Sequence, residues 1–246
     1  MRFAGKVALI TGAGSGIGRA VARRLAAEGA EVYALDIDGS RLAETVRGAD
    51  RPMTARTADL SDPDSCSAAV ADCVAALGRL DVLGNIAGIY LAAHTVDMAR
   101  DAYRKVMAVN LDAYFFLAQA AIPHLLASGG NIVNIASNAG IQGVPYSAAY
   151  CASKGGVIQL TRSLAVEFLK TALRVNAIAP AGTNTNIAAS ASFPTDMDPD
   201  LAARMAGLRG MAEPEEVAAL FSFLASEEAR SVTGAVYTLD NGLTAS

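Results

Sequence analysis

The amino-acid sequence predicts an α/β fold in which one doubly wound, parallel sheet of about seven strands has helices on both faces. Short apolar runs alternate with longer segments of helical periodicity along the whole chain, as expected for repeated strand-helix-strand units. Several of these runs are apolar throughout and lack the two-residue alternation of a half-exposed strand. Hydrophobic residues make up 52% and charged residues 18% of the 246 residues, which is enough apolar material for a sheet buried on both faces.

The predicted strands follow one another with helical segments between them. They are Val7–Gly12, Glu31–Asp36, Thr54–Leu60, Leu80–Gly88, Asn131–Ser137, Arg174–Pro180 and Ala235–Asp240. Between the third and the fourth, Pro63 stands near a helix start and Gly78 follows its end, which predicts a helix between them. Because crossovers between parallel strands are right-handed, this order favours a doubly wound sheet.

No linker or internal repeat divides the chain, so residues 1–246 are predicted to form one domain. One irregular tract, Asn184–Asp200, is rich in Ala, Ser, Asn, Asp and Pro. Long irregular loops in compact domains are usually functional, and this one follows a predicted strand. We therefore predict that residues 184–210 form a lid over a substrate; the alternative is a disordered insertion.

Charge and composition exclude several classes of partner. The net charge is −4 and no Lys/Arg cluster is present, which argues against binding to nucleic acid or to an anionic membrane. Cys66, Cys73 and Cys151 have no metal-ligand spacing, and with only His94 and His124 to join them no metal site is predicted. Both histidines are expected to have surface or structural roles.

The chain start lacks the apolar core of a signal peptide, and the most apolar stretch, residues 113–127, is interrupted by polar residues and a proline. These features predict a soluble, cytoplasmic protein without a membrane segment. Small molecules are its expected partners.

A glycine-rich turn joins the first strand to the first helix in "VALITGAGSGIGRA", with Gly12, Gly16 and Gly18 at the tight positions. Such a turn lets backbone N–H groups and a helix N-terminus approach a pyrophosphate without interference from side chains. An ordinary strand-helix turn is the alternative, but the position in the first strand-helix-strand unit favours a Rossmann-type dinucleotide site.

Asp36 closes the second strand about 20 residues after the glycines, where an acidic side chain accepts hydrogen bonds from an adenosine ribose. A carboxylate there also repels a 2′-phosphate. No basic residue occupies positions 13–17, and Ile37 and Asp38 follow Asp36, so these segments offer no phosphate clamp. The cofactor is therefore predicted to be NAD rather than NADP, although a solvated strand end is the alternative interpretation of Asp36.

Tyr150 and Lys154, in "AYCASKGG", stand four residues apart and therefore on one face of a helix. With seven tyrosines and four lysines in the chain, the number of such pairs expected by chance is roughly one tenth. The spacing by itself therefore does not establish a function. Read with the glycine turn, it is consistent with a tyrosine that transfers a proton.

Taken together, these motifs resemble the short-chain dehydrogenase/reductase family in its form of about 250 residues, from end to end of the chain. Thr11, Gly12, Gly16 and Gly18 match its glycine motif. "NIAG" (residues 85–88) resembles its N-N-A-G segment, and "NAIAPAGTNT" (residues 176–185) resembles its nicotinamide segment. The resemblance implies four catalytic residues: Asn110, Ser137, Tyr150 and Lys154.

The resemblance also implies a dinucleotide site. Its residues would be Gly12, Ser15, Gly16, Ile17, Gly18, Asp36, Ile37, Asp59, Leu60, Asn85, Ala87, Gly88, Tyr150, Lys154, Pro180, Thr183 and Thr185. Two positions depart from the family pattern: Ile86 replaces an asparagine, and Ala181 replaces the glycine after Pro180. The second substitution puts the shape of the loop beside the nicotinamide in doubt.

The implied chemistry is oxidation of a secondary alcohol or reduction of its ketone. Tyr150 would act as the base, and a neighbouring ammonium together with the positive nicotinamide would favour its phenolate. Lys154 would also bind the nicotinamide ribose, Ser137 would hydrogen-bond the substrate oxygen, and Asn110 would anchor a water. A serine at a strand end more commonly bonds its own backbone, which is the alternative for Ser137, and a buried asparagine at an irregular helix turn is the alternative for Asn110.

The substrate is predicted to be a neutral, moderately apolar small molecule, because the expected pocket segments are mainly uncharged, with Asn138 and Gln142 as polar contacts. The family resemblance implies a homotetramer. A rival function is 3-oxoacyl-(acyl carrier protein or CoA) reduction, which Asp36 and the absence of basic residues in "ASGGN" disfavour. A non-catalytic dinucleotide sensor is the alternative from another class.

Overall fold

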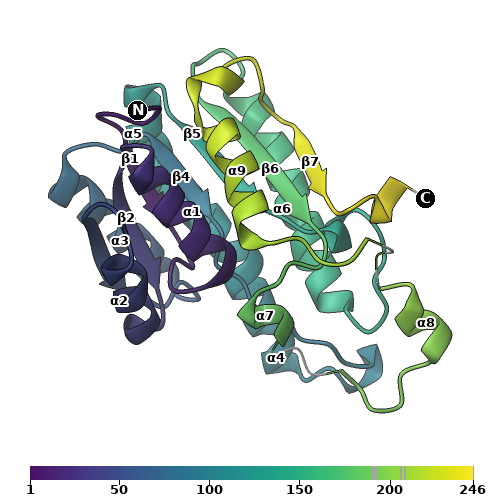
Figure 1. Cartoon of the computed structure of the whole chain (residues 1–246). Coiled ribbons are helices and arrows are strands. Elements are labelled where there is room, and N and C mark those ends of the chain that lie inside the picture. Colours follow the sequence, from purple (N-terminus) through teal and green to yellow (C-terminus); the bar gives the residue numbers. More distant parts are fainter. Residues whose placement is uncertain (190–192, 206, 208, 246) are drawn as a thin grey trace.

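The computed structural model describes residues 1–189, 193–205, 207 and 209–245 and contains the predicted doubly wound sheet (Figure 1). Parallel strands lie in the order β3-β2-β1-β4-β5-β6-β7. Their bounds are β1 Val7–Ile10, β2 Glu31–Asp36, β3 Met53–Thr57, β4 Val82–Asn85, β5 Asn131–Ile135, β6 Arg174–Pro180 and β7 Val236–Leu239. The seven predicted strands are confirmed, with ends that differ by a few residues.

Helices and short helical turns connect the strands. The α-helices are α1 Gly16–Ala27, α2 Gly39–Arg47, α3 Pro63–Leu77, α4 Arg100–Met107, α5 Ala113–Ser128, α6 Ala148–Glu167, α7 Asn186–Ala189, α8 Pro199–Ala203 and α9 Pro214–Ala225. The short turns are η1 Thr95–Asp97, η2 Ala108–Asp112, η3 Asn138–Gly140, η4 Glu227–Ala229 and η5 Leu243–Ala245, of which η2 is π-helical.

The direction in which the sheet grows reverses at β1, which pairs with β2 on one side and with β4 on the other. In an open parallel sheet, the carboxyl ends of the strands on the two sides of such a reversal frame a crevice that binds ligands. The functional site is therefore expected beyond the carboxyl ends of β1 and β4.

Helices cover both faces of the sheet (Figure 1). On one face α1, α2 and α9 bury residues such as Leu25 and Phe221 against the strands. On the other face α3, α5 and α6 bury residues such as Val70, Leu117 and Val157. This double burial explains why the strands are continuous apolar runs in the sequence.

Local capping fixes the predicted helix between Pro63 and Gly78. The Asp62 carboxylate accepts a hydrogen bond from the Asp64 N–H, and Pro63 occupies the first turn. Gly78 ends the helix with φ of +79°, a left-handed conformation that favours glycine. The predicted helix is confirmed at both ends.

The helices α4, η2 and α5 form one helical run, Arg100–Ser128, that is long and apolar enough to cross a membrane by length and composition alone. Its inward side chains, among them Tyr114, Leu117 and Leu125, belong to the hydrophobic core beside the sheet. Such packing is that of a core helix in a sheet protein, so this run is no argument for a membrane span.

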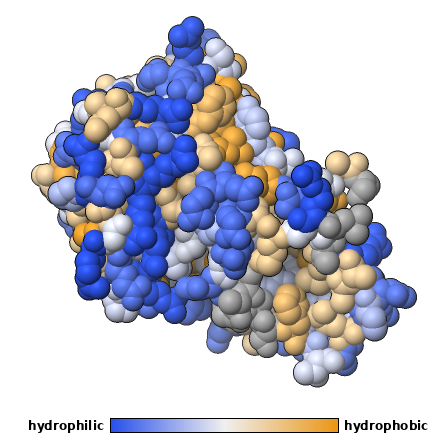
Figure 2. All heavy atoms as spheres, in the orientation of Figure 1, coloured by the Kyte–Doolittle hydropathy of each residue, from blue (hydrophilic) through white to orange (hydrophobic). Residues whose placement is uncertain are grey.

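The segments that follow β4 and β6 extend beyond the carboxyl edge of the sheet and carry α4, α7 and α8 on the same side of the molecule (Figure 1). On the α1 and α2 side, the surface is dominated by hydrophilic side chains (Figure 2). The segments after β4 and β6 therefore lie on the side of the expected crevice, whereas the surface of α1 and α2 faces solvent.

Candidate active site

The predicted site residues gather along the carboxyl edge of the sheet. Gly12 follows β1, Asp36 ends β2, Asn85 ends β4, Ser137 follows β5 and Pro180 ends β6. Because parallel strands all end at the same edge, residues more than 150 positions apart in the chain meet there.

The glycine turn leaves no room for side chains. Gly12 has φ of +65°, and a Cβ atom there would lie 2.9 Å from the Cα of Ala87. A Cβ on Gly18 would lie 2.0 Å from the carbonyl oxygen of Gly12. The first N–H groups of α1 have no partner within the helix, and the Ser15 side chain forms no capping hydrogen bond. This cradle of backbone donors fits the pyrophosphate of a dinucleotide.

Thr11 joins the glycine turn to the segment after β4, a role that reasoning from the sequence missed. Its Oγ1 accepts hydrogen bonds from the N–H groups of Ile86 and Ala87 at 2.8 and 3.0 Å, and it donates to the Gly84 carbonyl at 3.2 Å. The substitution at Ile86 is harmless to this link because the backbone makes it.

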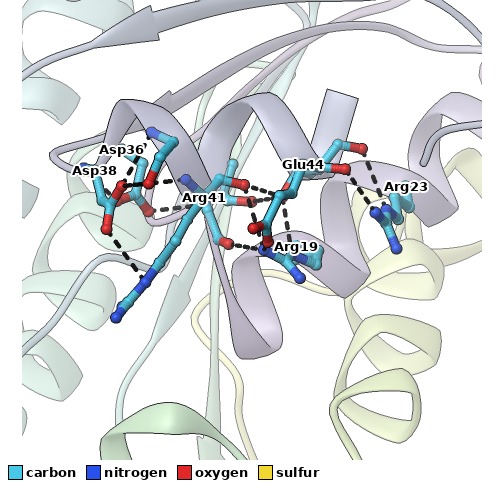
Figure 3. Close-up of polar contacts among 10 residues, drawn as sticks. Arg19, Arg23, Asp36, Asp38, Arg41 and Glu44 are labelled. Carbon is cyan, nitrogen blue, oxygen red and sulfur yellow. Dashed lines mark hydrogen bonds and ion pairs between the residues drawn. The ribbon is translucent and has the colours of Figure 1, made fainter. Parts of the chain in front are cut away.

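Asp36 is bonded to the glycine turn. Its Oδ2 accepts from the Gly14 N–H at 2.8 Å and its Oδ1 accepts from the Asp38 N–H at 2.9 Å (Figure 3). A Cβ on Gly14 would lie only 2.7 Å from the Asp36 Cγ. The carboxylate therefore holds the turn as well as marking the end of β2, so Asp36 is more than a solvated strand end.

Two arginines lie closer to this carboxylate than the sequence indicated. The Arg19 guanidinium donates to the carbonyls of Gly14 and Arg41, and Arg41 pairs with Asp38, with 3.2 Å between Nε and Oδ2 (Figure 3). Arg19 comes from α1 and Arg41 from α2, outside the turn and the strand end on which the expectation of no phosphate clamp rests. These two side chains therefore have to be included when the choice between NAD and NADP is argued.

Other predicted dinucleotide residues differ in exposure. Ile37 is 63% exposed, whereas Leu60 is buried in the core and Asn85 is fully buried. The Asn85 amide donates to Asn134 Oδ1 at 2.9 Å, which ties β4 to β5 beneath the site. The Asp59 carboxylate accepts from Ser61, and Thr183 is buried and donates to the Ala181 carbonyl at 3.1 Å.

Thr185 approaches the glycine turn from β6. A Cβ on Gly16 would lie 3.0 Å from the Thr185 Cγ2. Both residues line a cavity of about 200 Å³ that also contacts Arg19, Asn184 and Pro214. The two segments that the sequence assigned to the dinucleotide are thus in contact.

The Tyr150 and Lys154 pair lies in α6 as predicted, with Lys154 Nζ 5.9 Å from the centre of the Tyr150 ring. Lys154 is 3% exposed, and its Nζ donates to the Ile135 carbonyl at 2.7 Å and to the Tyr114 hydroxyl at 3.4 Å. Tyr150 is half-buried. The ammonium therefore faces the tyrosine ring but is hydrogen-bonded to β5 and α5.

Burial dominates the protonation of both residues. It raises the pKa of Tyr150 to about 12, while hydrogen bonding with Ser137 acts in the opposite direction. Burial also lowers the pKa of Lys154 to about 7. The expectation that the ammonium favours the phenolate does not hold for the chain by itself, because desolvation outweighs the charge.

Ser137 shows the local bonding that was the alternative for it, and it also lies near Tyr150. Its Oγ accepts from the Ala139 N–H at 3.1 Å and donates to Asn138 Oδ1 at 3.2 Å, the local bonding common for serine at a strand end. The same side chain lies close enough to Tyr150 to lower the pKa of that phenol. A local turn thus holds the hydroxyl beside the tyrosine.

Asn110 lies in the π-helical turn η2 and is fully buried, so the interpretation as a buried asparagine at an irregular helix turn is confirmed. Its Oδ1 accepts from the Ile89 N–H at 2.8 Å, and its Nδ2 donates to the Ile89 carbonyl at 2.9 Å and to Ser153 Oγ at 3.2 Å. The side chain thereby ties the segment after β4 to α6.

Two further glycines allow the catalytic segments to approach. A Cβ on Gly88 would lie 3.3 Å from Asn110 Oδ1 and 3.7 Å from Lys154 Nζ. A Cβ on Gly140 would lie 2.6 Å from the backbone carbonyl of Lys154, so η3 packs directly on α6. Gly140 was missed in the sequence because its partner is more than ten residues away.

Aromatic side chains surround Tyr150 on its outer side. The Tyr90 ring stands edge-on to that of Tyr150, with ring centres 4.9 Å apart, and its hydroxyl lies 2.6 Å from Ser147 Oγ. Phe193, from the segment after β6, lies 5.8 Å from the Tyr90 ring. Residues 190–192, 206 and 208 of the predicted lid lie outside the described residues.

Polar contacts fasten the same segment to the loop after β4. His94 Nε2 lies 3.0 Å from Asp196 Oδ1, and its ring packs edge-on against Tyr146 at 5.1 Å. The Tyr146 hydroxyl accepts from the Asp198 N–H at 2.9 Å. Within the described residues, the tract 184–210 contains α7 and α8 and is fastened at these points, and the structural role expected for His94 is confirmed.

Comparison with known proteins agrees with this geometry. A family model described as enoyl-(acyl carrier protein) reductase matches residues 12–244. Meso-2,3-butanediol dehydrogenase of Serratia marcescens is 39% identical over 250 residues, which cover 100% of this chain and 97% of that protein. The chain belongs to the short-chain dehydrogenase/reductase family. The 3-oxoacyl-[acyl-carrier-protein] reductase of Thermotoga maritima is 39% identical over 251 residues, covering 99% of each chain.

Solved structures of the family extend the comparison. A short-chain dehydrogenase from Mycobacterium paratuberculosis bound to NAD superposes with a TM-score of 0.92 at 34% identity, covering 100% of both chains. One from Burkholderia cenocepacia in complex with NADP gives 0.89 at 34% identity, covering 99% of this chain and 100% of that one. The protein is thus an oxidoreductase that acts on CH–OH groups with a nicotinamide dinucleotide.

Proposed function

We propose that the protein is an NAD-dependent dehydrogenase that interconverts a neutral secondary alcohol and its ketone, with Tyr150 as the general base or acid. The observation that supports this function best is the meeting of Ser137, Tyr150 and Lys154 beside the glycine turn. A phenol, a hydroxyl and an amine near one another can supply a proton acceptor, an orienting group and, when the amine is protonated, a positive charge.

A nicotinamide dinucleotide held at the glycine turn would supply the acceptor for the hydride of the carbinol carbon. Tyr150 removes the hydroxyl proton, and Ser137 orients the substrate oxygen toward it. Lys154 has two N–H groups directed at Ile135 and Tyr114, which leaves a third for the ribose and the tyrosine side. Asn110 holds the segment after β4 in place, and its proposed water would link Lys154 to solvent.

The preference for NAD rests on Asp36. Its carboxylate stands at the end of β2, where the adenosine ribose is expected, and would accept hydrogen bonds from the ribose hydroxyls. The remaining predicted dinucleotide residues, from Ser15 to Thr185, are proposed to line the same site. Arg19 and Arg41 are held by carbonyl and carboxylate partners, so they offer less to a 2′-phosphate than free arginines would.

The proposed substrate is neutral and compact because of the groups around Tyr150. Tyr90 and Phe193 form an aromatic wall beside it, and burial raises the pKa of Tyr90, which keeps this phenol uncharged. Asn138 and Gln142 are the proposed polar contacts. An uncharged wall of this kind favours apolar groups next to the carbinol carbon.

The test is absorbance of the reduced nicotinamide while wild-type protein is mixed with a panel of cyclic and acyclic secondary alcohols, with NAD and NADP in parallel. We expect turnover with NAD, and we expect kcat/KM with NADP to be at least about tenfold lower than with NAD. Turnover confined to NADP would reject the cofactor assignment, and binding of NAD without turnover of any alcohol or ketone would favour the sensor.

A second candidate is 3-oxoacyl thioester reduction, which the 39% identity to a 3-oxoacyl-[acyl-carrier-protein] reductase supports. Small 3-oxoacyl thioesters with NADH and NADPH belong in the same panel. A kcat/KM for these thioesters at least about 100-fold above that for every simple ketone would replace the proposed substrate class with this one.

We further propose that residues 184–210 act as a lid. Support comes from Phe193, which reaches the aromatic wall, and from Asp196 and Asp198, which fasten the segment to the loop after β4 and to Tyr146. Tyr146 has φ of +58°, an unusual conformation for a tyrosine, and its carbonyl accepts from the Ala93 N–H at 2.8 Å. A small loop change at Tyr146 would therefore release the lid.

The His94–Asp196 pair makes the lid contact depend on pH. Hydrogen bonding to Asp196 raises the pKa of His94, with Asp97 adding to the effect, and the same hydrogen bond lowers the pKa of Asp196. The pair is therefore complete below the ordinary histidine pKa of about 6.5, weakens as pH rises through the raised value, and weakens again in acid as Asp196 protonates. The Asp198 N–H should be better protected from hydrogen exchange at pH 6 than at pH 8, after correction for intrinsic rates.

The control for this prediction is His94→Gln, which keeps a polar side chain without a titrating ring. It should remove the difference in Asp198 protection between the two pH values. Equal protection at both pH values in the wild type, or a difference that persists in the variant, would contradict the proposed role of the pair.

We also propose a cytoplasmic homotetramer. Exposed apolar side chains stand on α4 and α5, among them Tyr103, Phe115 and Leu126, and Tyr103 also lines a cavity of about 390 Å³ between α4 and the start of α6. Apolar patches often mark subunit contacts, and free cysteines fit a reducing compartment. Light scattering should give four times the chain mass of 25.2 kDa, and a monomeric mass would contradict the tetramer. Fractionation of cells that recovered the protein from an oxidising compartment would contradict the cytoplasmic location.

A further inference from the structure

Tyr114 is a buried phenol that no sequence motif assigned to the site. It lies in α5, one helical turn after Asn110, and is 1% exposed. A phenol this deep in a hydrophobic core must satisfy its hydroxyl group, and an equally large phenylalanine would fill the same space without that requirement. The position of the hydroxyl therefore needs an explanation beyond packing.

The Tyr114 hydroxyl touches three parts of the active site. It donates toward the Ala87 carbonyl at 3.1 Å and the Ile135 carbonyl at 3.2 Å, and it accepts from Lys154 Nζ at 3.4 Å. Ala87 belongs to the proposed dinucleotide segment, and Ile135 precedes Ser137 by two residues. One hydroxyl thus joins the ends of β4 and β5 to the lysine of α6.

We propose that Tyr114 is a positioning residue that holds the Lys154 ammonium in place for catalysis, an inference that rests on the proposed function. Lys154 Nζ lies 5.1 Å from the centre of the Tyr114 ring and 5.9 Å from that of Tyr150, so the ammonium sits between two aromatic rings. With the Ile135 carbonyl as the second acceptor, Tyr114 fixes where the remaining N–H of the ammonium points.

The surroundings of Lys154 make the hydroxyl important. The groups that face its Nζ are Tyr150 on α6, Tyr114 on α5 and the Ile135 carbonyl on β5, and Gly88 lies between it and the Asn110 amide oxygen. Burial is the cause that shifts its pKa, and no described carboxylate contributes to that shift. Few hydrogen-bond acceptors therefore stabilise the charged amine of Lys154. Loss of one of these acceptors should lower the pKa of the amine.

The experiment is a titration of the lysine side chains by ¹³Cε NMR in protein without cofactor. The chain has four lysines, Lys6, Lys105, Lys154 and Lys170, and the Lys154 signal is assigned by its absence in Lys154→Arg. Tyr114→Phe keeps the ring and removes only the hydroxyl. We expect the pKa of Lys154 to fall by at least about 0.5 unit in this variant, a roughly threefold loss of the protonated fraction relative to the neutral one.

Tyr33→Phe is the matched control. Tyr33 is 5% exposed and belongs to the same hydrophobic cluster as Tyr114, but its hydroxyl interacts with Arg56 rather than with the site. The Lys154 titration should be unchanged in this variant. Identical Lys154 titrations in the wild type and Tyr114→Phe would overturn the proposal, as would an equal shift in Tyr33→Phe.

A kinetic readout separates this inference from the proposed function. With a less charged Lys154, Tyr150 ionises less readily, so the acid limb of the kcat/KM profile for alcohol oxidation should move to higher pH in Tyr114→Phe, with the alkaline plateau kept within about threefold. A uniform loss at all pH values would indicate a structural role only. If the wild type oxidises no alcohol but its Lys154 titration shifts in Tyr114→Phe, the dehydrogenase assignment fails and the positioning role stands.

Discussion

Replacement of Tyr150 by phenylalanine is expected to lower kcat for alcohol oxidation about 10²- to 10⁴-fold, the range that a positioned general base contributes. The phenylalanine ring keeps the edge-on contact with Tyr90 and the packing above Lys154. Dinucleotide affinity should therefore change less than about threefold. Steady-state kinetics, together with calorimetric titration of NAD into both proteins, measures the two effects separately.

Tyr90→Phe is the matched control for this prediction. Tyr90 is the neighbouring tyrosine, 4.9 Å away between ring centres, and its hydroxyl is bonded to Ser147 rather than placed beside Ser137. Its loss should change kcat less than about tenfold. If Tyr150→Phe kept kcat within tenfold of the wild type, another group would have to accept the proton and the proposed mechanism would be wrong.

The same mechanism requires that the pKa of Tyr150, which burial raises, be lowered during catalysis. Burial raises the pKa of Tyr150 to about 12 and lowers that of Lys154 to about 7, so near neutral pH the chain by itself holds a neutral phenol beside a partly protonated lysine. Positive charge brought by the bound nicotinamide ring favours the phenolate. The acid limb of the wild-type kcat/KM profile should therefore lie well below pH 12, and its absence in Tyr150→Phe would assign that limb to this tyrosine.

Sequence reasoning was effective where local rules decide the structure. Continuous apolar runs identified the strands because both faces of the sheet are covered, and Pro63 and Gly78 marked the ends of α3 because backbone chemistry restricts those positions. The four proposed catalytic positions were implied by the family resemblance, and β5, η2 and α6 bring them to one region of the structure.

Contacts between distant segments could not be read in this way. Thr11 bonds to residues 75 and 76 positions later, Tyr114 reaches Lys154 across 40 positions, and Arg19 and Arg41 meet near Asp36 only after α1 and α2 have folded. The pKa directions of Tyr150 and Lys154 were also hidden, because they depend on burial rather than on the four-residue spacing. Neither contacts between distant segments nor the burial of a side chain can be inferred from the residues next to it in the sequence.

Replacement of Asp36 by alanine is expected to shift the ratio of kcat/KM for NAD over NADP by about 100-fold or more in favour of NADP. Loss of hydrogen bonds from the ribose to a charged acceptor weakens NAD by about 1.5–3 kcal/mol. The substitution also removes the repulsion between the Asp36 carboxylate and the 2′-phosphate of NADP. This repulsion is about 4 kcal/mol for unit charges 4 Å apart near a protein surface. Initial rates with both cofactors at a fixed alcohol concentration give the ratio.

Two further variants separate charge from support of the turn. Asp36→Ala also removes both acceptors of the Gly14 and Asp38 N–H groups, whereas Asp36→Asn removes the charge but keeps one oxygen that accepts from one of these two N–H groups. Both variants should gain NADP activity, but Asp36→Asn should retain the higher melting temperature. Arg41→Ala in the Asp36→Asn background should then reduce the NADP activity again, because Arg41 is the exposed guanidinium beside this site (Figure 3). If NADP remained excluded in both variants, the shape of the glycine turn would determine the choice of cofactor, and the carboxylate of Asp36 would serve only to hold that turn.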